Sequence, residues 1–562
     1  MAFKLRKWQE EAVNKSLNWF ENKKDKKFLI NAAPGSGKTF CATVIANELI
    51  KKNEIERVVV IAPMKEVVKK WSQDFHTITG RNMMKFTGEI EDDSFDICAT
   101  WHAVEGLLDG FQHICKKYKT LIICDEHHHA AIAAVWGEGA GKAFFDSKYV
   151  VVLTGTPIRT DGKEPIWFSY SPTSGKLVHP QEGTYTLDYG QAVDYGYCRP
   201  ITFHRHEGNF DVHLNNESLA VSGKDGVDVD EKKFPKKLVK SIQNSVNFYT
   251  LARKPIYVND DGVTPDINSY QSTMLQWGID KLEDVKLRTP EAGGLVIAPS
   301  IKVADYMAKL LEILTKEKPI LVHTETRNTE DKIDIFRKSK KNWLVSVAMI
   351  SEGVDIPRLR VLVYLPNPQT ELSFRQAIGR VVRTLGEEDE SRAYCVMPLH
   401  EKFVEYARRV LSEMSPKYLS EQIVKNKICP SCRIELKKDQ KVCPECSFEF
   451  PAKKTTYKHC LNDQCAALNP VSASTCGSCG ESFHIKYKIN LASAFRDGVI
   501  ANELDISEED VQLAEKNFEQ LRKDFLEEGD PQMLALMKKV PKEAWGKIAK
   551  YTQKWFSDKE EK

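Results

Sequence analysis

The sequence of 562 residues contains no apolar run that approaches the ~20 residues needed to cross a bilayer. Its first residues (M-A-F-K-L-R-K-W-Q) lead directly into a motif, with no apolar signal segment before it. The chain also lacks an excess of charge of one sign, because its 81 Lys and Arg residues nearly balance its 79 Asp and Glu residues and leave a net charge of +2. Any polyanion must therefore be bound by local patches. We expect a cytoplasmic protein of several domains, with no membrane contact.

Cysteine is scattered singly over most of the chain and concentrated in one segment. Of the 14 cysteines, eight form four pairs between Cys429 and Cys479, and ten residues separate the two pairs in each half of this segment. Four thiolates with this spacing are typical of a zinc ribbon, so we expect two Cys₄ zinc sites built from adjacent pairs. Crossed pairing and an iron–sulfur cluster stay open as alternatives, and the scattered single cysteines disfavour disulfides. The expected zinc ligands are Cys429, Cys432, Cys443, Cys446, Cys460, Cys465, Cys476 and Cys479.

A glycine-containing loop near the N-terminus has the composition of a phosphate-binding loop. Residues 32–39 read A-A-P-G-S-G-K-T, between an apolar run expected to be a buried strand (Phe28–Ala32) and a stretch of helical periodicity (Thr39–Lys51). In this context Gly35, Ser36 and Gly37 let backbone N–H groups close around phosphates. Lys38 adds a point charge at the β and γ groups of ATP, and the Thr39 hydroxyl can hold Mg²⁺.

A pair of carboxylates follows a second apolar run. Thr120–Cys124 ends at once in Asp125 and Glu126, which places both side chains at the carboxyl end of a parallel strand, where open α/β sheets bind ligands. We expect Asp125 to hold Mg²⁺ and Glu126 to orient the attacking water. The histidines at 127–129 are expected to be polar neighbours of this site, since adjacent histidines do not share a helix face as metal ligands would.

Further short motifs surround these two in a recognisable order. Leu5–Gln9 (L-R-K-W-Q) precedes the loop, and Ala62–Pro63, Thr100–His102 and Thr154–Pro157 each follow an apolar run. With the loop and the Asp-Glu pair, these motifs resemble those of superfamily 2 helicases of the DEAD/DEAH-box class, over about residues 1–410. The resemblance implies that Gln9 reads the adenine edge, that 62–63 and 100–102 contact the nucleic-acid backbone, and that 154–157 links ATP state to strand contact.

Two motifs of the same family lie in the second half of the chain. Ser351–Pro357 (S-E-G-V-D-I-P) resembles motif V, and the resemblance implies that Gly353 and Asp355 lie near the nucleotide. Gln376–Arg383 (Q-A-I-G-R-V-V-R) resembles motif VI and is expected to be helical, so that its two arginines, three positions apart, share one face. A guanidinium delivered by a second domain makes hydrolysis depend on domain closure. The residues expected to act here are Gln376, Arg380 and Arg383.

These observations predict an α/β protein with two tandem RecA-like (P-loop) domains, each built on a parallel sheet. Gly294–Ala298 is expected to open the second domain with a strand, and the polar stretch Gly208–Lys233 is expected to be loop. Helical periodicity predicts helices within Lys236–Leu251 and Ser507–Phe525. The expected divisions are 1–205, the first RecA-like domain; 206–292, a linker or insertion; 293–412, the second RecA-like domain; 428–485, paired Cys₄ zinc ribbons; and 486–562, a helical C-terminal region.

A motor followed by a cysteine-rich module resembles the RadD-like branch of the family, and the core also resembles UvsW-type and XPB-like helicases. The resemblance implies an ATP-dependent DNA helicase or translocase in DNA repair, with single-stranded or forked DNA as partner. An RNA helicase with the same motor is one alternative. The other is a nucleic-acid-gated ATPase switch or scaffold in a defence or restriction system. The sequence contains no clear nuclease constellation, so any cutting would need a partner. A protein partner could bind through the zinc ribbons or through the C-terminal helices. The lysines and aromatic residues of the ribbons suit single-strand binding, and they equally suit the minimal core and soluble surface of a small zinc module.

Overall fold

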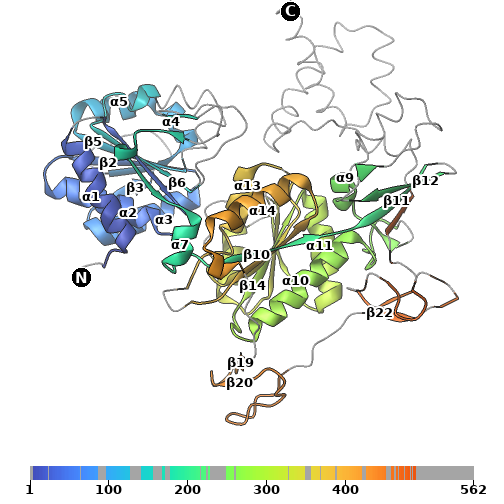
Figure 1. Cartoon of the computed structure of the whole chain (residues 1–562). Helices are drawn as coiled ribbons and strands as arrows, with labels where there is room; N and C mark the ends of the chain where they lie inside the picture. The colour runs from blue at the N-terminus through green and yellow to red at the C-terminus, as the bar shows by residue number, and fades with distance from the viewer. Residues whose placement is uncertain are drawn as a thin grey trace, which may run out of the picture.

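The structure is a computed structural model, drawn for the whole chain in Figure 1. It describes residues 4–22, 25–63, 65–85, 96–126, 141–155, 168–170, 177–214, 217–222, 226–227, 248–258, 261–323, 325–326, 328–347, 356–367, 369–385, 389–419, 426–450 and 457–488, without 461, 463, 466, 472, 474, 481, 482 and 484. Gly353 and Asp355, the histidines at 127–129, most of the stretch 236–251 and the helix expected at 507–525 lie outside the described residues.

The N-terminal part of the chain is built on a seven-stranded sheet with the order β3-β4-β2-β5-β6-β1-β9, and its strands pair in parallel. Its central strands are short runs of Val, Ile and Leu that are buried on both faces, as a parallel sheet covered by helices requires. The strands are β1 (Lys27–Ala32), β2 (Arg57–Ala62), β3 (Met83–Lys85), β4 (Asp96–Thr100), β5 (Thr120–Asp125), β6 (Tyr149–Thr154) and β9 (Thr184–Leu187).

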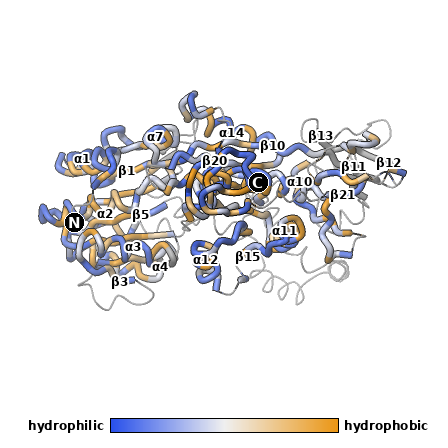
Figure 2. Tube along the Cα trace, turned by 90° about the horizontal axis from the view of Figure 1, so that it is seen from below, coloured by the Kyte–Doolittle hydropathy of each residue, from blue (hydrophilic) through white to orange (hydrophobic). Residues whose placement is uncertain are grey.

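Helices cover both faces of this sheet and form two hydrophobic cores. Alternate residues of β2 enter opposite cores: Val58 and Val60 pack with Trp71, whereas Val59 and Ile61 pack on the other face. Figure 2 shows hydrophobic residues gathered along the central strands. The helices of this part are α1 (Lys7–Glu21), α2 (Lys38–Lys51), α3 (Lys65–Thr79), α4 (Trp101–Gly106), α5 (Leu108–Lys117), the 3₁₀ turn η2 (Gln181–Gly183) and α7 (Tyr189–Asp194).

A second parallel sheet has six strands in the order β10-β18-β17-β14-β16-β15. Its strands are β10 (Ile201–His206), β14 (Gly293–Ala298), β15 (Ile320–Val322), β16 (Trp343–Val347), β17 (Leu359–Tyr364) and β18 (Ala393–Pro398). Its helices are α9 (Phe248–Ala252), α10 (Tyr270–Lys286), α11 (Ile301–Thr315), α12 (Thr329–Lys338), α13 (Glu371–Ile378), α14 (Glu401–Glu413) and the 3₁₀ turn η5 (Pro416–Tyr418).

The two parallel sheets confirm the predicted pair of RecA-like domains. The second sheet also includes segments that precede residue 293, where we expected its domain to begin. β10 forms its edge, and α10 packs against β17 and β18. The apolar residues on one side of α10, such as Met274 and Leu275, are buried by this packing, which is why a segment expected to be linker is part of the domain.

The expectation that Gly208–Lys233 is loop is wrong. β11 (Asn209–Leu214) and β12 (Glu217–Ser222) form an antiparallel hairpin, extended by β13 (Gly226–Val227), and β11 also pairs in parallel with β23 (Ile485–Lys488). The segment N-F-D-V-H-L alternates polar and apolar residues with the period of a strand. The alternation is short, and one of its pairing partners, β23, lies far along the chain from β11, so the sequence pattern alone did not reveal the sheet.

The expectation that Gln376–Arg383 is one helix is also wrong. α13 ends at Ile378, Gly379 caps it, and both Arg380 and Arg383 lie in the chain that follows. The N–H groups of Arg380 and Val381 donate to the carbonyls three residues before them, those of Ala377 and Ile378, at 3.1 and 3.0 Å, so the chain leaves the helix in a tighter turn. Arg199 holds this turn: its Nη1 donates to the Val381 carbonyl at 3.0 Å, and its backbone N–H donates to the Val382 carbonyl at 2.6 Å.

The cysteine-rich segment forms two small modules, each with a two-stranded hairpin (Figure 1). The hairpins are β19 (Asn426–Ile428) with β20 (Glu435–Lys437) and β21 (Tyr457–His459) with β22 (Leu468–Pro470); a third short pair, β7 (Ser169–Tyr170) with β8 (Leu177–Val178), lies in the N-terminal part. In the described part of the chain, the helices are too short or too polar to cross a membrane.

Candidate nucleotide and zinc sites

The phosphate loop joins β1 to α2, as predicted. Gly35 and Gly37 both have left-handed backbone, with φ of +80° and +97°, a conformation that side chains rarely adopt. The Ser36 side chain is fully buried, and its Oγ has no hydrogen-bond partner among the described residues. A buried hydroxyl without a partner, in a loop of glycines at a helix N-terminus, fits a site built to receive phosphate oxygens.

The first motif of the chain, Leu5–Gln9, forms hydrogen bonds to this loop. Arg6 Nη1 and Trp8 Nε1 donate to the Ser36 carbonyl at 2.9 and 3.2 Å, and Gln9 Nε2 donates to the Gly37 carbonyl at 3.1 Å. Gln9 Oε1 also accepts from the Arg6 backbone N–H at 2.9 Å. The amide of Gln9 therefore lies beside the loop, and its two polar atoms hold the loop and the start of α1 together.

The acidic pair lies where β5 ends. Asp125 is buried, with 7% of its surface exposed, and its Oδ2 accepts from Trp71 Nε1 of α3 at 2.8 Å. Glu126 has a φ of +48°, an uncommon conformation for a residue with a side chain. Such outliers cluster at functional sites, where the surrounding structure holds them in place.

Lys38 lies at the centre of these parts. Its Nζ donates to the Ala32 carbonyl at 3.0 Å and lies 3.9 Å from Glu126 Oε1. A Cβ at Gly155, the second residue of the motif after β6, would lie 2.8 Å from this Nζ, so the start of that motif packs against the Lys38 ammonium. The ends of three adjacent strands, β1, β5 and β6, thus bring together the loop, the acidic pair and the start of the third motif.

The arginine-bearing turn of the second sheet contacts the phosphate loop of the first. A Cβ at Gly35 would lie 2.7 Å from Arg383 Cγ, and a Cβ at Gly379 would lie 2.8 Å from Pro34 Cβ. Arg380 is buried, with 8% of its surface exposed. The Nε of Arg383 donates to the Gly379 carbonyl at 3.2 Å. Gln376 lies in the last turn of α13, before these residues.

The predicted zinc ligands form two groups from adjacent pairs: Cys429, Cys432, Cys443 and Cys446 in one, and Cys460, Cys465, Cys476 and Cys479 in the other. Within each group the sulfur atoms lie within 4.8 Å of one another. The closest Sγ pairs are separated by 3.5 Å in the first group and by 3.6 and 3.8 Å in the second. A tetrahedral zinc ion with Zn–S bonds of about 2.3 Å separates its sulfurs by about 3.8 Å. The geometry fits zinc, and every cysteine is free of disulfides.

Backbone N–H groups support the thiolate form of some ligands. Hydrogen bonding from the Phe448 backbone lowers the pKa of Cys446 to about 6, and the backbone N–H groups of Cys479 and Ser478 lower the pKa of Cys476 to about 6.

The sequence analysis did not identify Asn469, which is 4% exposed and supports the second group. Its Nδ2 donates to Cys476 Sγ at 3.4 Å, and its Oδ1 accepts from the Gly477 backbone at 2.9 Å. In the sequence Asn469 is only an asparagine between two cysteine pairs, and its burial is seen in the structure alone.

The sequence also showed no sign of Trp71 and Arg199, because their hydrogen-bond partners, Asp125 and the carbonyls near motif VI, are far away in sequence.

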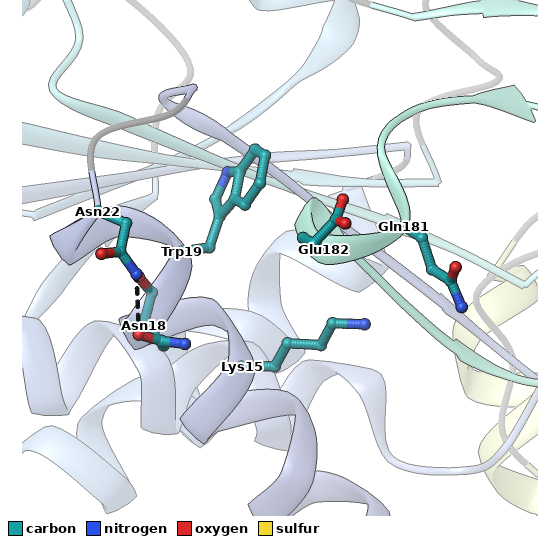
Figure 3. A pocket seen from close by; sticks show the side chains of 6 residues that line it. All are labelled: Lys15, Asn18, Trp19, Asn22, Gln181 and Glu182. Atoms are coloured by element: carbon teal, nitrogen blue, oxygen red, sulfur yellow. Dashed lines mark hydrogen bonds between the residues drawn. The ribbon is translucent and has the colours of Figure 1, made fainter.

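A shallow depression of about 330 Å³ between α1 and η2 contains none of the predicted site residues (Figure 3). It is lined by Lys15, Asn18, Trp19, Asn22, Gln181 and Glu182.

Two family models match the chain. Residues 2–159 match "Type III restriction enzyme, res subunit", and residues 278–384 match "Helicase conserved C-terminal domain". An uncharacterized protein of Mycobacterium tuberculosis is 29% identical over 386 residues, which cover 68% of this chain and 59% of that protein. This chain thus spans about three fifths of the length of the mycobacterial relatives it matches, 59 to 60%.

An archaeal relative and a solved structure have lower identity. The DNA 3'-5' translocase XPB2 of Sulfurisphaera tokodaii is 23% identical over 399 residues, covering 68% of this chain and 80% of that protein. The ATP-dependent Type ISP restriction-modification enzyme LlaBIII bound to DNA aligns with 15% identity and a TM-score of 0.46, over 74% of this chain and 30% of that chain. The ordered motifs, the two parallel sheets that carry them and both family matches support a superfamily 2 helicase.

Proposed function

We propose that this chain is an ATP-driven DNA helicase or translocase that hydrolyses ATP between its two RecA-like domains. The observation that carries the proposal is the contact between Arg383 and Gly35. It joins an arginine-bearing turn of the second sheet to the phosphate loop of the first. Domain closure and the delivery of positive charge to the loop are then a single event, as a motor that couples hydrolysis to movement requires.

In this proposal the loop residues Gly35, Ser36 and Gly37 bind the phosphates, and Lys38 neutralises the β and γ groups. Thr39 and Asp125 would hold Mg²⁺, which when bound offsets the charge of the phosphate oxygens. The unpartnered Ser36 hydroxyl and the buried Asp125 carboxylate support these assignments. Gln9, beside the loop, is the residue proposed to read adenine.

Hydrolysis itself needs a positioned water and a stabilised transition state. Glu126 is proposed to orient and polarise the water, and its uncommon backbone and its 3.9 Å distance from Lys38 support this role. Arg380 and Arg383 would stabilise the charge that develops on the transferred group, and a finger of this kind contributes ~10³-fold or more. Gln376 precedes them in the same motif, and Gly353 and Asp355 of motif V are proposed to lie near the nucleotide.

DNA is the proposed substrate, in single-stranded or forked form, with a role in DNA repair. The likeness to an archaeal protein named as a DNA translocase supports DNA over RNA. The assignment to the RadD-like branch stays a prediction. The two cysteine groups would each hold one structural Zn²⁺.

A second candidate function has its own support. The match of residues 2–159 to the res subunit of type III restriction enzymes favours an ATP-gated switch within a restriction or defence system. In that case cutting would belong to a partner protein, bound through the zinc modules or the C-terminal region, since we identified no nuclease constellation in the sequence.

Steady-state ATP hydrolysis measured with single-stranded DNA, duplex DNA, forked DNA and RNA, with Lys38→Ala as the blank, tests both candidates. Stimulation mainly by DNA, together with strand displacement by the isolated chain, is the expected result. Stimulation mainly by RNA would move the substrate to RNA. DNA-stimulated hydrolysis without displacement or translocation would favour the switch.

A further inference from the structure

The segment that joins the two RecA-like domains, Tyr197–Arg199, contacts the phosphate loop. The guanidinium of Arg6, which holds the Ser36 carbonyl, lies 4.6 Å over the centre of the Tyr197 ring. The Cys198 thiol donates to the Pro34 carbonyl at 3.3 Å. Tyr197, Cys198 and Arg199 are all buried, with 8%, 2% and 0% exposure, so this connection is packed into the protein along its whole length.

The same three residues also bind the turn that carries the motif VI arginines. The backbone of Cys198 forms an antiparallel bridge with that of Arg383, and the Thr384 hydroxyl donates to the Tyr197 carbonyl at 3.3 Å. The connection is therefore paired with motif VI on one side and with the phosphate loop on the other.

The Arg199 side chain fixes this arrangement. Nη1 donates to the Val381 carbonyl of motif VI at 3.0 Å, and Nη2 donates to the Pro357 carbonyl, at the end of motif V, at 2.8 Å. Nη2 also lies 2.6 Å from Asp389 Oδ2, and Nε donates to Ser391 Oγ at 2.8 Å. The Arg199 guanidinium thus links motif V to motif VI. A lysine ammonium could not place its N–H donors at both carbonyls.

The charge of this cluster is buried as well as paired. Arg360, also fully buried, shares Asp389 and Ser391 with Arg199. Burial alone raises the pKa of the Asp389 carboxyl, but the guanidiniums of Arg199 and Arg360 outweigh that effect and hold its pKa well below the usual range. Burial lowers the pKa of Arg199. Such a network is rigid when complete and loses its geometry when one member is removed.

We propose that Tyr197–Arg199 is the mechanical connection between the phosphate loop and the arginine-bearing turn, and that Arg199 is the positioning residue that sets Arg380 and Arg383 for hydrolysis. The proposal rests on the proposed function, since it assigns Arg199 a role that acts through the motif VI arginines. In the described part of the chain, the hydrogen bonds of the Arg199 side chain go to Leu359, Val381, Pro357, Asp389 and Ser391 and not to the loop. Its effect must therefore appear in turnover and not in the binding of nucleotide.

Arg199→Lys tests this directly, because lysine keeps the charge beside Asp389 but cannot bind both motif carbonyls at once. The matched control is Arg358→Lys, since Arg358 also binds buried backbone carbonyls of the second domain, those of Phe336 and Lys341 at 2.8 and 2.7 Å, away from motif VI. We expect Arg199→Lys to lower kcat of nucleic-acid-stimulated ATP hydrolysis about 10-fold or more, with KM for ATP within about 3-fold. Arg358→Lys should lower the melting temperature and keep kcat.

A combined variant separates a positioning role from a general loss of stability. If Arg199 acts through the two motif VI arginines, then adding Arg199→Lys to a variant that carries both Arg380→Ala and Arg383→Ala should cause no further loss of turnover. A multiplied loss in that combination, an equal kcat loss in Arg358→Lys, or a folded Arg199→Lys with kcat within about 2-fold of the parent would each overturn the proposal.

Two further results keep the outcomes distinct. If Arg199→Lys does not fold, Ser391→Ala removes one bond that orients the guanidinium and should lower kcat about 3-fold without a change in KM, and an unchanged kcat there would also overturn the proposal. If Arg383→Ala keeps the parent turnover, the finger assignment within the proposed function fails, whatever Arg199 does.

Discussion

Replacing Trp71 with phenylalanine removes one hydrogen bond from the carboxylate that we propose holds Mg²⁺. The indole N–H donates to Asp125 Oδ2 across 2.8 Å, and both residues are buried, with 1% and 7% exposure. A hydrogen bond to a charged group contributes about 1.5 to 3 kcal/mol. At about 1.36 kcal/mol for each factor of ten, this free energy corresponds to about 10- to 160-fold. Partners that orient metal ligands cost about 10- to 100-fold when removed, which agrees with this range.

The loss should appear in the metal dependence of the protein. We expect the Mg²⁺ concentration for half-maximal ATP hydrolysis to rise about 10- to 100-fold in Trp71→Phe, with most of kcat recovered at saturating Mg²⁺. Binding of Mn²⁺ in the presence of ATP, followed by electron paramagnetic resonance, gives a readout that does not depend on turnover. Phenylalanine fills most of the indole volume, so the carboxylate loses its orientation without a large cavity forming.

Trp19→Phe is the matched control, because Trp19 is also buried and donates its N–H at 2.8 Å, but to the Lys27 carbonyl at the opposite end of β1 from the phosphate loop. Both variants should lose a similar amount of stability, and only Trp71→Phe should weaken metal binding. An unchanged Mg²⁺ and Mn²⁺ dependence in a folded Trp71→Phe would refute the role of the indole. An equal change in Trp19→Phe would assign the effect to stability.

Three further predictions concern the loop, the acidic pair and the zinc modules. Gly35→Ala places a Cβ 2.7 Å from Arg383 Cγ in a left-handed conformation, so ATP hydrolysis should fall about 10-fold or more in steady-state assays; a kcat equal to the parent would contradict this contact. Glu126→Gln should bind a fluorescent ATP analogue normally yet hydrolyse ATP about 100-fold more slowly or worse, and normal turnover would remove it from the proposed role. Cys443→Ser should lower zinc from two ions per chain to one in elemental analysis, whereas Asn469→Ala should retain two at high zinc and lose one more readily to a chelator; two tightly held ions in Cys443→Ser would show that the ligand set is wrong.

The sequence predicted those parts of the fold in which local pattern and burial agree. The runs Phe28–Ala32, Thr120–Cys124 and Gly294–Ala298 are mainly apolar, as is typical of strands covered on both faces, and each is a strand within one residue of the expected limits. The cysteine spacing predicted the grouping of the ligands for a similar reason. Each hairpin is short, so that pairs adjacent in sequence are adjacent in space.

The remaining features depend on contacts between distant segments. α13 ends before the two arginines, and the turn that carries them is held by Arg199, a partner that no pattern within Gln376–Arg383 records. Likewise, the hydrogen bond from Trp71 joins α3 to the end of β5. Side chains that hold a site from other elements have no periodicity of their own, so the motifs locate the site while its supports become visible only in the folded chain.

The two zinc modules also contact segments that are distant from them in the sequence. A segment of about 25 residues has too little core to fold alone, and zinc binding would supply most of its folding free energy. The first module is docked on the loop between α10 and β14, where the Ile428 N–H donates to the Leu287 carbonyl and Arg433 pairs with Glu291. An exposed ion pair contributes only about 0 to 1 kcal/mol, so this pair adds little to the stability of the module. The second module leads into β23, the strand that completes the sheet of β11 and β12. We infer that loss of zinc at either site acts on the motor domain as well as on the module, because the folded module is what presents each of these contacts.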